Sequence, residues 1–244
     1  MKAKNRKNFR AVTAALSIAA VALLAFGSIG GARAALSYSD TYTAQIGTQN
    51  IGVGLVETTG ENDPQSIENG GELLTNLLDE NEAFKIGKVY DEKLAVENTG
   101  TINTFVRLTI HKYWADPDGN KATDLSPDLI HLEFDDENWI VVENADEPET
   151  ITLYYTLPLA SGETTNDVLE SLQVDSELET LVTQTEVPVD GGVDIITTFK
   201  YDGYSIGLNA EADAVQTHNA EDAILSAWGV NAAGADSGMI TGIN

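Results

Sequence analysis

Carboxylates and histidines are the side chains in this sequence that could hold a metal ion or exchange protons. The chain contains 39 Asp and Glu residues, no Cys, and three histidines, His111, His131 and His218. None of the histidines lies in an H-E-x-x-H segment, which would place two zinc ligands on one helical face with a glutamate base between them. We therefore interpret the histidines as surface or hydrogen-bonded polar residues, predict no catalytic residue, and expect that the protein is not an enzyme.

One acidic segment resembles part of a calcium-binding loop. Asp116, Asp118 and Asn120 carry oxygen atoms at alternate positions around Gly119, and alternating oxygen ligands can surround a hard cation. The segment lacks the spacing and the distal bidentate glutamate of an EF-hand. The favoured interpretation is a hairpin turn, in which Pro117 fixes φ and Gly119 adopts a positive φ. Calcium is the only cofactor that the sequence suggests.

The charge of the chain restricts the partners that it can bind. The formal net charge of all 244 residues is −26. Residues 1–34 contain six Lys and Arg and no acidic residue, so the remainder has seven basic and 39 acidic side chains, a net charge of −32. Such a surface repels phosphates, and we expect no binding of nucleic acid. The lack of cysteine excludes disulfides and zinc–thiolate sites.

Residues 1–34 have the three parts of a secretory signal peptide. Five basic residues lie within the first ten, an apolar run covers residues 11–26, and a small-x-small sequence occupies residues 32–34. The apolar run is shorter than the ~20 residues that a spanning helix needs, and glycines follow it. We predict cleavage between Ala34 and Ala35, with a retained N-terminal anchor as the alternative. The mature chain is then secreted to the cell surface or extracellular matrix and has no membrane span.

Alternation of apolar and polar residues dominates the mature chain and predicts strands. Residues 94–97 and 106–110 alternate on either side of the turn sequence Asn-Thr-Gly, which predicts a hairpin. Further strands are predicted at residues 51–55, 139–142, 151–157 and 204–214. Short helices are predicted at residues 72–80, 167–172 and 219–228, the last with Asn219 as its cap and Gly229 as its stop. 

This pattern predicts a mainly β protein, an antiparallel β-sandwich with two or three short helices. We expect a single domain at residues 35–230. Residues 231–244 are small and polar and show no periodicity, so a flexible C-terminal tail is predicted there.

The segment that follows the predicted cleavage site is rich in Tyr and Thr and has a high β-propensity. As a new N-terminus, it can pair within its own sheet or add a strand to an open sheet of another copy. Repeated head to tail, the second arrangement grows into a filament. The candidate donor-strand residues are Leu36, Tyr38, Tyr42, Ala44 and Ile46.

Two parts of the sequence resemble a known family. The glycine-rich cleavage region with the Tyr-Ser-Asp sequence at residues 38–40 and the strand at residues 51–55 resembles the TasA/camelysin family, as does the segment at residues 96–110. The resemblance implies processing by a SipW-type signal peptidase and a jelly-roll-like sandwich. It also implies a biofilm matrix fibre subunit that self-associates by donor-strand exchange and meets other matrix proteins.

Three functional hypotheses follow. The leading one is a secreted structural subunit of an extracellular or biofilm matrix fibre, with the mature N-terminus as the donor strand. The second is a camelysin-like cell-surface metalloprotease, for which the sequence offers no recognisable zinc motif. The third is a monomeric surface binding module, stabilised by calcium or specific for a sugar.

Overall fold

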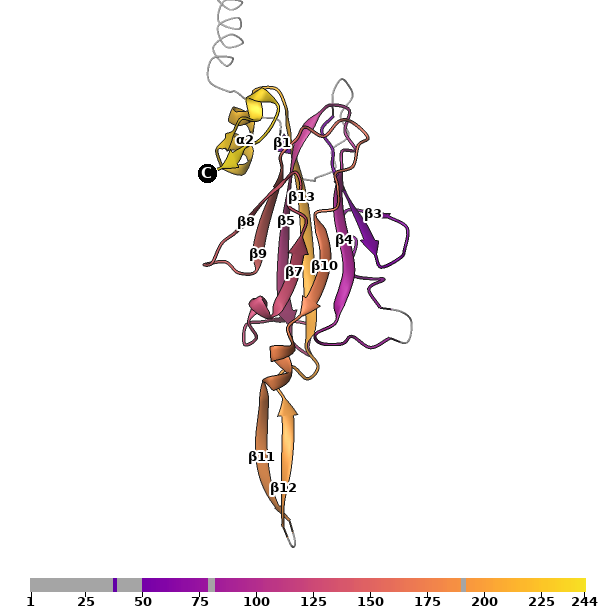
Figure 1. Cartoon of the computed structure of the whole chain (residues 1–244), viewed down its shortest axis with the longest axis vertical. Helices are drawn as coiled ribbons and strands as arrows, with labels where there is room; N and C mark the ends of the chain where they lie inside the picture. Colours follow the sequence, from indigo (N-terminus) through magenta and orange to yellow (C-terminus); the bar gives the residue numbers. More distant parts are fainter. Residues whose placement is uncertain (1–36, 39–49, 79–81, 190–191) are drawn as a thin grey trace, which may run out of the picture. The chain divides into compact units, whose positions relative to one another are not determined.

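The computed structural model describes residues 37–38, for which it gives the backbone, and residues 50–78, 82–189 and 192–244. The chain divides into two compact units, residues 1–35 and 36–244, and the described residues all belong to the second. This unit is a mainly β structure in which every described strand pair is antiparallel (Figure 1). The predicted antiparallel sandwich is therefore confirmed. No helix within these ranges is long and apolar enough to cross a membrane.

Two sheets form the sandwich. The first sheet contains, in spatial order, β1 (Ser37–Tyr38), β13 (Ser205–Gln216), β5 (Thr104–Ala115), β9 (Thr150–Tyr155) and β8 (Trp139–Glu143), and β6 (Lys121–Ala122) pairs with the end of β5. The second sheet contains β3 (Gln65–Ile67), β2 (Gly54–Thr59), β4 (Val89–Glu97), β10 (Leu169–Val174) and β7 (Ile130–Phe134).

The inner faces of the two sheets bury a shared apolar core. Leu108 and Ile110 of β5 have no exposed surface and belong to one cluster with Leu94 and Val96 of β4. Their spacing of two residues matches the alternation seen in the sequence, since successive side chains of a strand point to opposite faces. A second cluster around Trp114 closes one end of the core.

The hairpin predicted between residues 94–97 and 106–110 is wrong, because the two strands belong to different sheets. β4 pairs with β2 and β10, whereas β5 pairs with β13 and β9. The chain crosses between the sheets next to Asn98, whose buried Nδ2 donates to the carbonyl oxygens of Ile102 and Leu159, both at 2.8 Å. Alternation shows which face of a strand is buried, but both strands here face the same core from opposite sides.

One of the three predicted helices is confirmed. Within the described part of the chain, α2 (Ala220–Trp228) is the one α-helix, and it ends at Gly229 with a φ of 75° as predicted. Asn219 precedes it with a φ of 50°, but its side chain makes no capping hydrogen bond. The remaining helical segments are the short 3-10 turns η1 (Pro127–Leu129), η2 (Ser176–Thr180) and η3 (Ala235–Ser237).

The other two predicted helices are wrong. Leu169 and Leu172 belong to strand β10 and lie three positions apart. Both are fully buried, although an odd spacing normally places two strand residues on opposite faces. A register shift between Leu169 and Ser171 lets both side chains face the core, because a bulge inserts one extra residue into the strand. The resulting spacing imitates that of a helix. Residues 72–78 form turns, and residues 79–81 lie outside the described part.

Residues 231–244 were expected to form a flexible tail, but they are folded in the structure. β14 (Ala232–Ala233) pairs with β15 (Gly242–Ile243), and the backbone N–H of Ile240 donates to the carbonyl of Thr156 at 2.8 Å. Ile240 is fully buried, as is Ile224 of α2. Small residues allow this close packing without the periodic pattern by which a sequence reveals a buried segment. We call residues 220–244 the C-terminal unit.

The C-terminal unit covers part of the outer face of the first sheet. Arg107 of β5 donates through Nε to Asp213 of β13 at 3.1 Å, and Nη2 donates to the same carboxylate oxygen. The Trp228 ring lies 5.3 Å from the Arg107 guanidinium carbon and 5.8 Å from the Tyr154 ring centre. Trp228 therefore covers part of the outer face of the sheet.

A substitution tests whether the C-terminal unit is part of the fold. Ile240→Ala removes a fully buried side chain, and we expect the free energy of unfolding to fall by about 2–5 kcal/mol. Met239→Ala is the matched control, because the neighbouring side chain is 47% exposed and should cost less than about 0.5 kcal/mol. Urea unfolding measures both values. Equal stability of the two variants would contradict a packed C-terminal unit.

Candidate functional site

One side of β13 is largely unpaired. β13 pairs with β5 without interruption from Ser205 opposite Ala115 to Gln216 opposite Thr104. On its other side, β13 pairs with β1 at Ala214 and Val215. Residues 205–213 have no strand partner on that side among the described residues. The N–H and C=O groups of such an edge form a template for another strand.

A groove of about 770 Å³ runs beside this edge, between the two sheets. On the β13 wall, the side chains that point between the sheets come from alternate residues, namely Ile206, Leu208, Ala210 and Ala212. The opposite wall consists of Val53, Leu55 and Ile67 from the β2–β3 side of the second sheet. These side chains form an apolar strip within a groove whose lining also includes the polar residues Glu68, Asn69, Glu72, Asn209 and Glu211. Most of the apolar side chains are only partly buried. The core of the sandwich is therefore open along this side.

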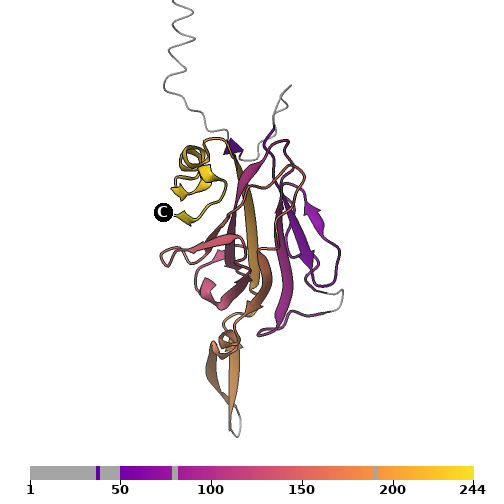
Figure 2. The same cartoon turned by 45° about the horizontal axis from the view of Figure 1, so that its top comes forward.

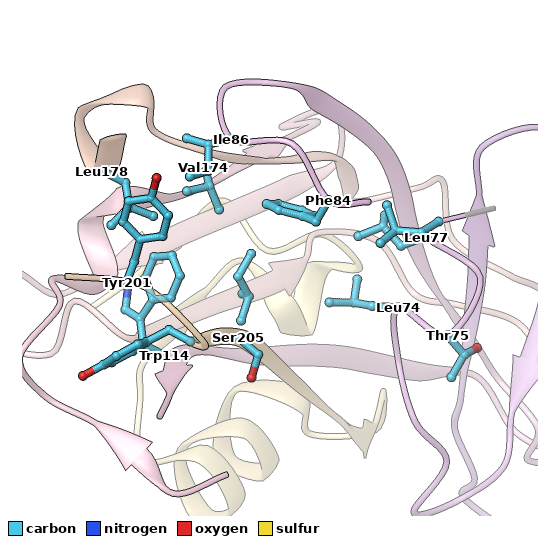
Figure 3. Close-up of a pocket in the computed structure, with 13 residues that line it drawn as sticks. Leu74, Thr75, Leu77, Phe84, Ile86, Trp114, Val174, Leu178, Tyr201 and Ser205 are labelled. Atoms are coloured by element: carbon cyan, nitrogen blue, oxygen red, sulfur yellow. The ribbon is translucent and has the colours of Figure 1, made fainter. Parts of the chain in front are cut away.

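An apolar cavity of about 400 Å³ adjoins the groove, since Leu74 and Ile206 line both. The aromatic side chains that line it include Phe84, Trp114 and Tyr201 (Figure 3). The cavity lies at the N-terminal end of β13, and Ser205, the first residue of that strand, also lines the cavity. The groove and the apolar cavity are thus continuous beside this edge of β13.

Two buried carboxyl groups support the loop between β3 and β4. Oε1 of Glu57 accepts a hydrogen bond from the backbone N–H of Leu74 at 2.7 Å, and Leu74 has a φ of 65°. Thr59 donates to Oε2 of Glu92 at 3.2 Å, and both Glu57 and Glu92 are buried on the inner face of the second sheet. Glu57 thus holds the strained backbone of a residue that lines both groove and cavity.

Glu92 is kept protonated by its surroundings. Burial, and then the neighbouring carboxyl group of Glu57, raise the pKa of Glu92 to about 9. A neutral carboxyl group avoids the cost of a buried charge. The second sheet, which provides one wall of the groove, therefore contains a buried carboxyl group that binds a proton at neutral pH.

The raised pKa predicts how stability depends on pH. Above pH ~5 the unfolded chain releases the Glu92 proton while the folded chain retains it, so stability falls as pH rises, until pH ~9. The slope contributed by this group is up to about −1.4 kcal/mol per pH unit. In Glu92→Gln the slope should become flatter by this amount, as urea unfolding across this range would measure.

Asp91→Asn is the matched control for Glu92→Gln. Asp91 is an exposed acidic residue that precedes Glu92 in β4, and Asp91→Asn makes the same acid-to-amide replacement on the solvent-facing side of the strand. We expect its slope to equal that of the unmodified chain. An identical slope in the two variants would contradict a protonated carboxyl group in the core.

Most of the predicted donor-strand and cleavage residues cannot be placed. Tyr38 lies in β1, where its backbone pairs with Ala214. The residues outside the described part are Ala34, Ala35, Leu36, Tyr42, Ala44 and Ile46.

The calcium candidate forms the hairpin turn between β5 and β6. Oδ1 of Asp116 accepts hydrogen bonds from the backbone N–H groups of Asp118 at 2.9 Å and Asn120 at 2.8 Å. Gly119 has a φ of 82°, as the turn interpretation predicts. The Asp116 carboxylate thus closes the turn. Within the described residues, no group of three or more His, Cys, Asp or Glu side chains could hold a metal ion.

The histidines take part in local polar contacts. His111 Nδ1 lies 3.0 Å from the Thr150 hydroxyl, and His131 Nε2 lies 2.9 Å from an Asp175 carboxylate oxygen. All three histidines are exposed. This confirms their interpretation as surface residues.

Sequence reasoning missed the buried pair Glu57 and Glu92. The signal was present, because Glu57 lies two residues after Leu55 and Glu92 lies two residues before Leu94. Each carboxylate therefore occupies an inward position of an alternating strand. 

The comparisons with known proteins give no further guide. No protein-family model matches the chain, and neither a curated protein nor a solved structure shows significant similarity to it. The case for a function therefore depends on the open edge of β13 and its groove.

Proposed function

We propose that the mature chain is a secreted structural subunit of an extracellular or biofilm matrix fibre. In this proposal, the N-terminal segment of one copy adds as a strand to β13 of the next copy. The observation that carries the proposal is the edge of β13 at residues 205–213, which has no strand partner among the described residues and lies beside an open groove with an apolar strip. Main-chain hydrogen bonds then provide affinity, and alternate side chains enter the groove.

The register of β1 supports this choice of donor strand. Ser37 pairs with Val215 and Tyr38 with Ala214, and each step forward along an antiparallel partner is one step back along β13. A donor strand in this register has Tyr42 opposite Ala210, Ala44 opposite Leu208 and Ile46 opposite Ile206. Each of these β13 residues lines the groove. The side chains proposed from the sequence thus enter the groove together.

The sizes of the facing side chains are complementary. In the proposed register, Tyr38 and Tyr42 lie opposite Ala214 and Ala210, so that each large ring meets a small residue. Pairs of large and small side chains fill the space between sheets without clashes. The last donor residue, Ile46, lies opposite Ile206, where the groove joins the apolar cavity.

A chain cannot fill its own groove in this register. Asn50 donates through its backbone N–H to the Thr101 hydroxyl, close to Thr104, which pairs with Gln216 at the far end of β13. From Ile206 to Gln216, β13 spans about 33 Å. Between Ile46 and Asn50, four residues reach at most about 14 Å. The complete donor strand must therefore come from another copy.

Two changes test the two partners of the proposed contact. Deletion of residues 35–46 removes the donor strand, and Ala210→Glu places a charge in the groove. We expect both mature proteins to remain folded and to form no fibres, as judged by circular dichroism and electron microscopy. A mixture of the two should form dimers at most, because each lacks a different partner of the contact.

Asn209→Glu is the matched control for Ala210→Glu. It introduces the same side chain one position earlier in β13. Asn209 also borders the groove, but its exposed side chain points to the opposite face of the sheet from Ala210. Fibres should form normally in this variant. Fibres of normal length from the deletion protein or from Ala210→Glu would refute the proposal.

A further inference from the structure

The hairpin formed by β11 (Val182–Val189) and β12 (Gly192–Phe199) projects from the sandwich (Figures 1 and 2). Every described residue in its two strands is exposed. The strands pair from Val182 opposite Phe199 to Val189 opposite Gly192. At the base, the Lys200 N–H donates to the carbonyl of Leu181 at 2.9 Å. A two-stranded hairpin without a covering layer is only marginally stable in water.

The surface of this hairpin is unusually apolar. Of the eleven large apolar side chains exposed in the described part of the chain, seven lie on its two strands. Directly opposite residues share a face, so both sides of the hairpin are apolar. One side carries Val182, Val193, Ile195 and Phe199 together with Pro188, and the other carries Val187, Val189 and Ile196. Exposed apolar patches of this kind mark protein interaction sites.

The hairpin is located where the proposed donor strand leaves the groove. β12 leads through residues 200–204 into Ser205, the first residue of β13. In the antiparallel register, residue 47 of the donor copy lies opposite Ser205, and Asn50 of that copy follows three positions later. A step of three positions spans at most about 11 Å. The folded part of the donor copy therefore begins beside the base of the hairpin.

We infer that the hairpin packs against the folded part of the copy whose N-terminal strand fills the adjacent groove. This inference rests on the proposed function and gives it a second contact. The β2 start and Asn50 of the donor copy lie at the end of its sandwich where β13 ends and the C-terminal unit begins. The hairpin, about 26 Å long for eight residues per strand, extends toward that end.

The C-terminal unit offers an apolar surface for this contact. Leu225 is 46% exposed and Met239 is 47% exposed. They are two of the four large exposed apolar residues that lie outside the hairpin in the described chain. A strand in the groove links two copies through a short connection. A hairpin that packs on Leu225 and Met239 also fixes the orientation of the two copies. Two linked contacts bind more tightly than either alone.

The test replaces residues 182–199 by Asn-Gly, a two-residue turn that suits the hydrogen bond between Leu181 and Lys200. We expect the shortened monomer to melt at the same temperature as the full mature chain. It should still polymerise through the strand, but its critical concentration should rise about 100-fold and its fibres should bend more in electron micrographs. Unchanged critical concentration and stiffness would overturn the inference.

A second variant tests the receiving surface. Leu225→Ser with Met239→Ser should raise the critical concentration in the same way, and combining it with the shortened hairpin should add nothing further, since both remove one contact. A full additional effect, or none from the serine pair alone, would refute this surface. If the full mature chain forms no fibres, the proposed function fails as well. Fibres that depend on residues 35–46 but not on the hairpin would refute the inference alone.

Discussion

Hydrogen bonding of the β13 backbone is the constraint on which the rest of the molecule depends. β13 is twelve residues long, and β5 pairs with all of them on one side. On the other side, the described partner covers two. The backbone groups of an edge strand must find water or another strand. Because this edge also borders the open side of the core, any strand that pairs here covers apolar side chains at the same time.

The surrounding residues keep this edge available for a strand. The alanines of β13 leave space where a closed sandwich would hold larger side chains. Glu57 fixes the backbone of Leu74, and the neutral carboxyl group of Glu92 neighbours Glu57 on the same sheet. At the other end of β13, the Arg107–Asp213 ion pair and Trp228 attach the C-terminal unit to the outer face. The inner face thus stays accessible, while the C-terminal unit covers part of the outer face.

The sequence predicts the faces of the strands well and their partners poorly. The alternation from Ile206 to Ala214 identifies the groove wall, because period-2 patterning reports burial directly. It could not show that β4 and β5 belong to different sheets, since both present the same alternation. Leu169 and Leu172 imitated a helix because a bulge changed their spacing.

Three further features lacked a readable pattern. Glu57 and Glu92 are carboxyl groups in a core, where hydrogen bonds replace the expected solvent. The C-terminal unit packs small residues that show no periodicity. The β11–β12 hairpin has apolar side chains on a surface, so its alternation is incomplete. The open edge itself is a property of the tertiary structure, and no local segment encodes it.

A disulfide between neighbouring copies would test the central claim most directly. The chain contains no cysteine, so Tyr42→Cys and Ala210→Cys in one mature protein are its only thiols. Residues directly opposite in an antiparallel ladder have Cα atoms about 4.5–5.5 Å apart, within the range of a disulfide. After oxidation, the account predicts a ladder of covalent multimers on a non-reducing gel. A monomer closed by an internal disulfide would contradict it.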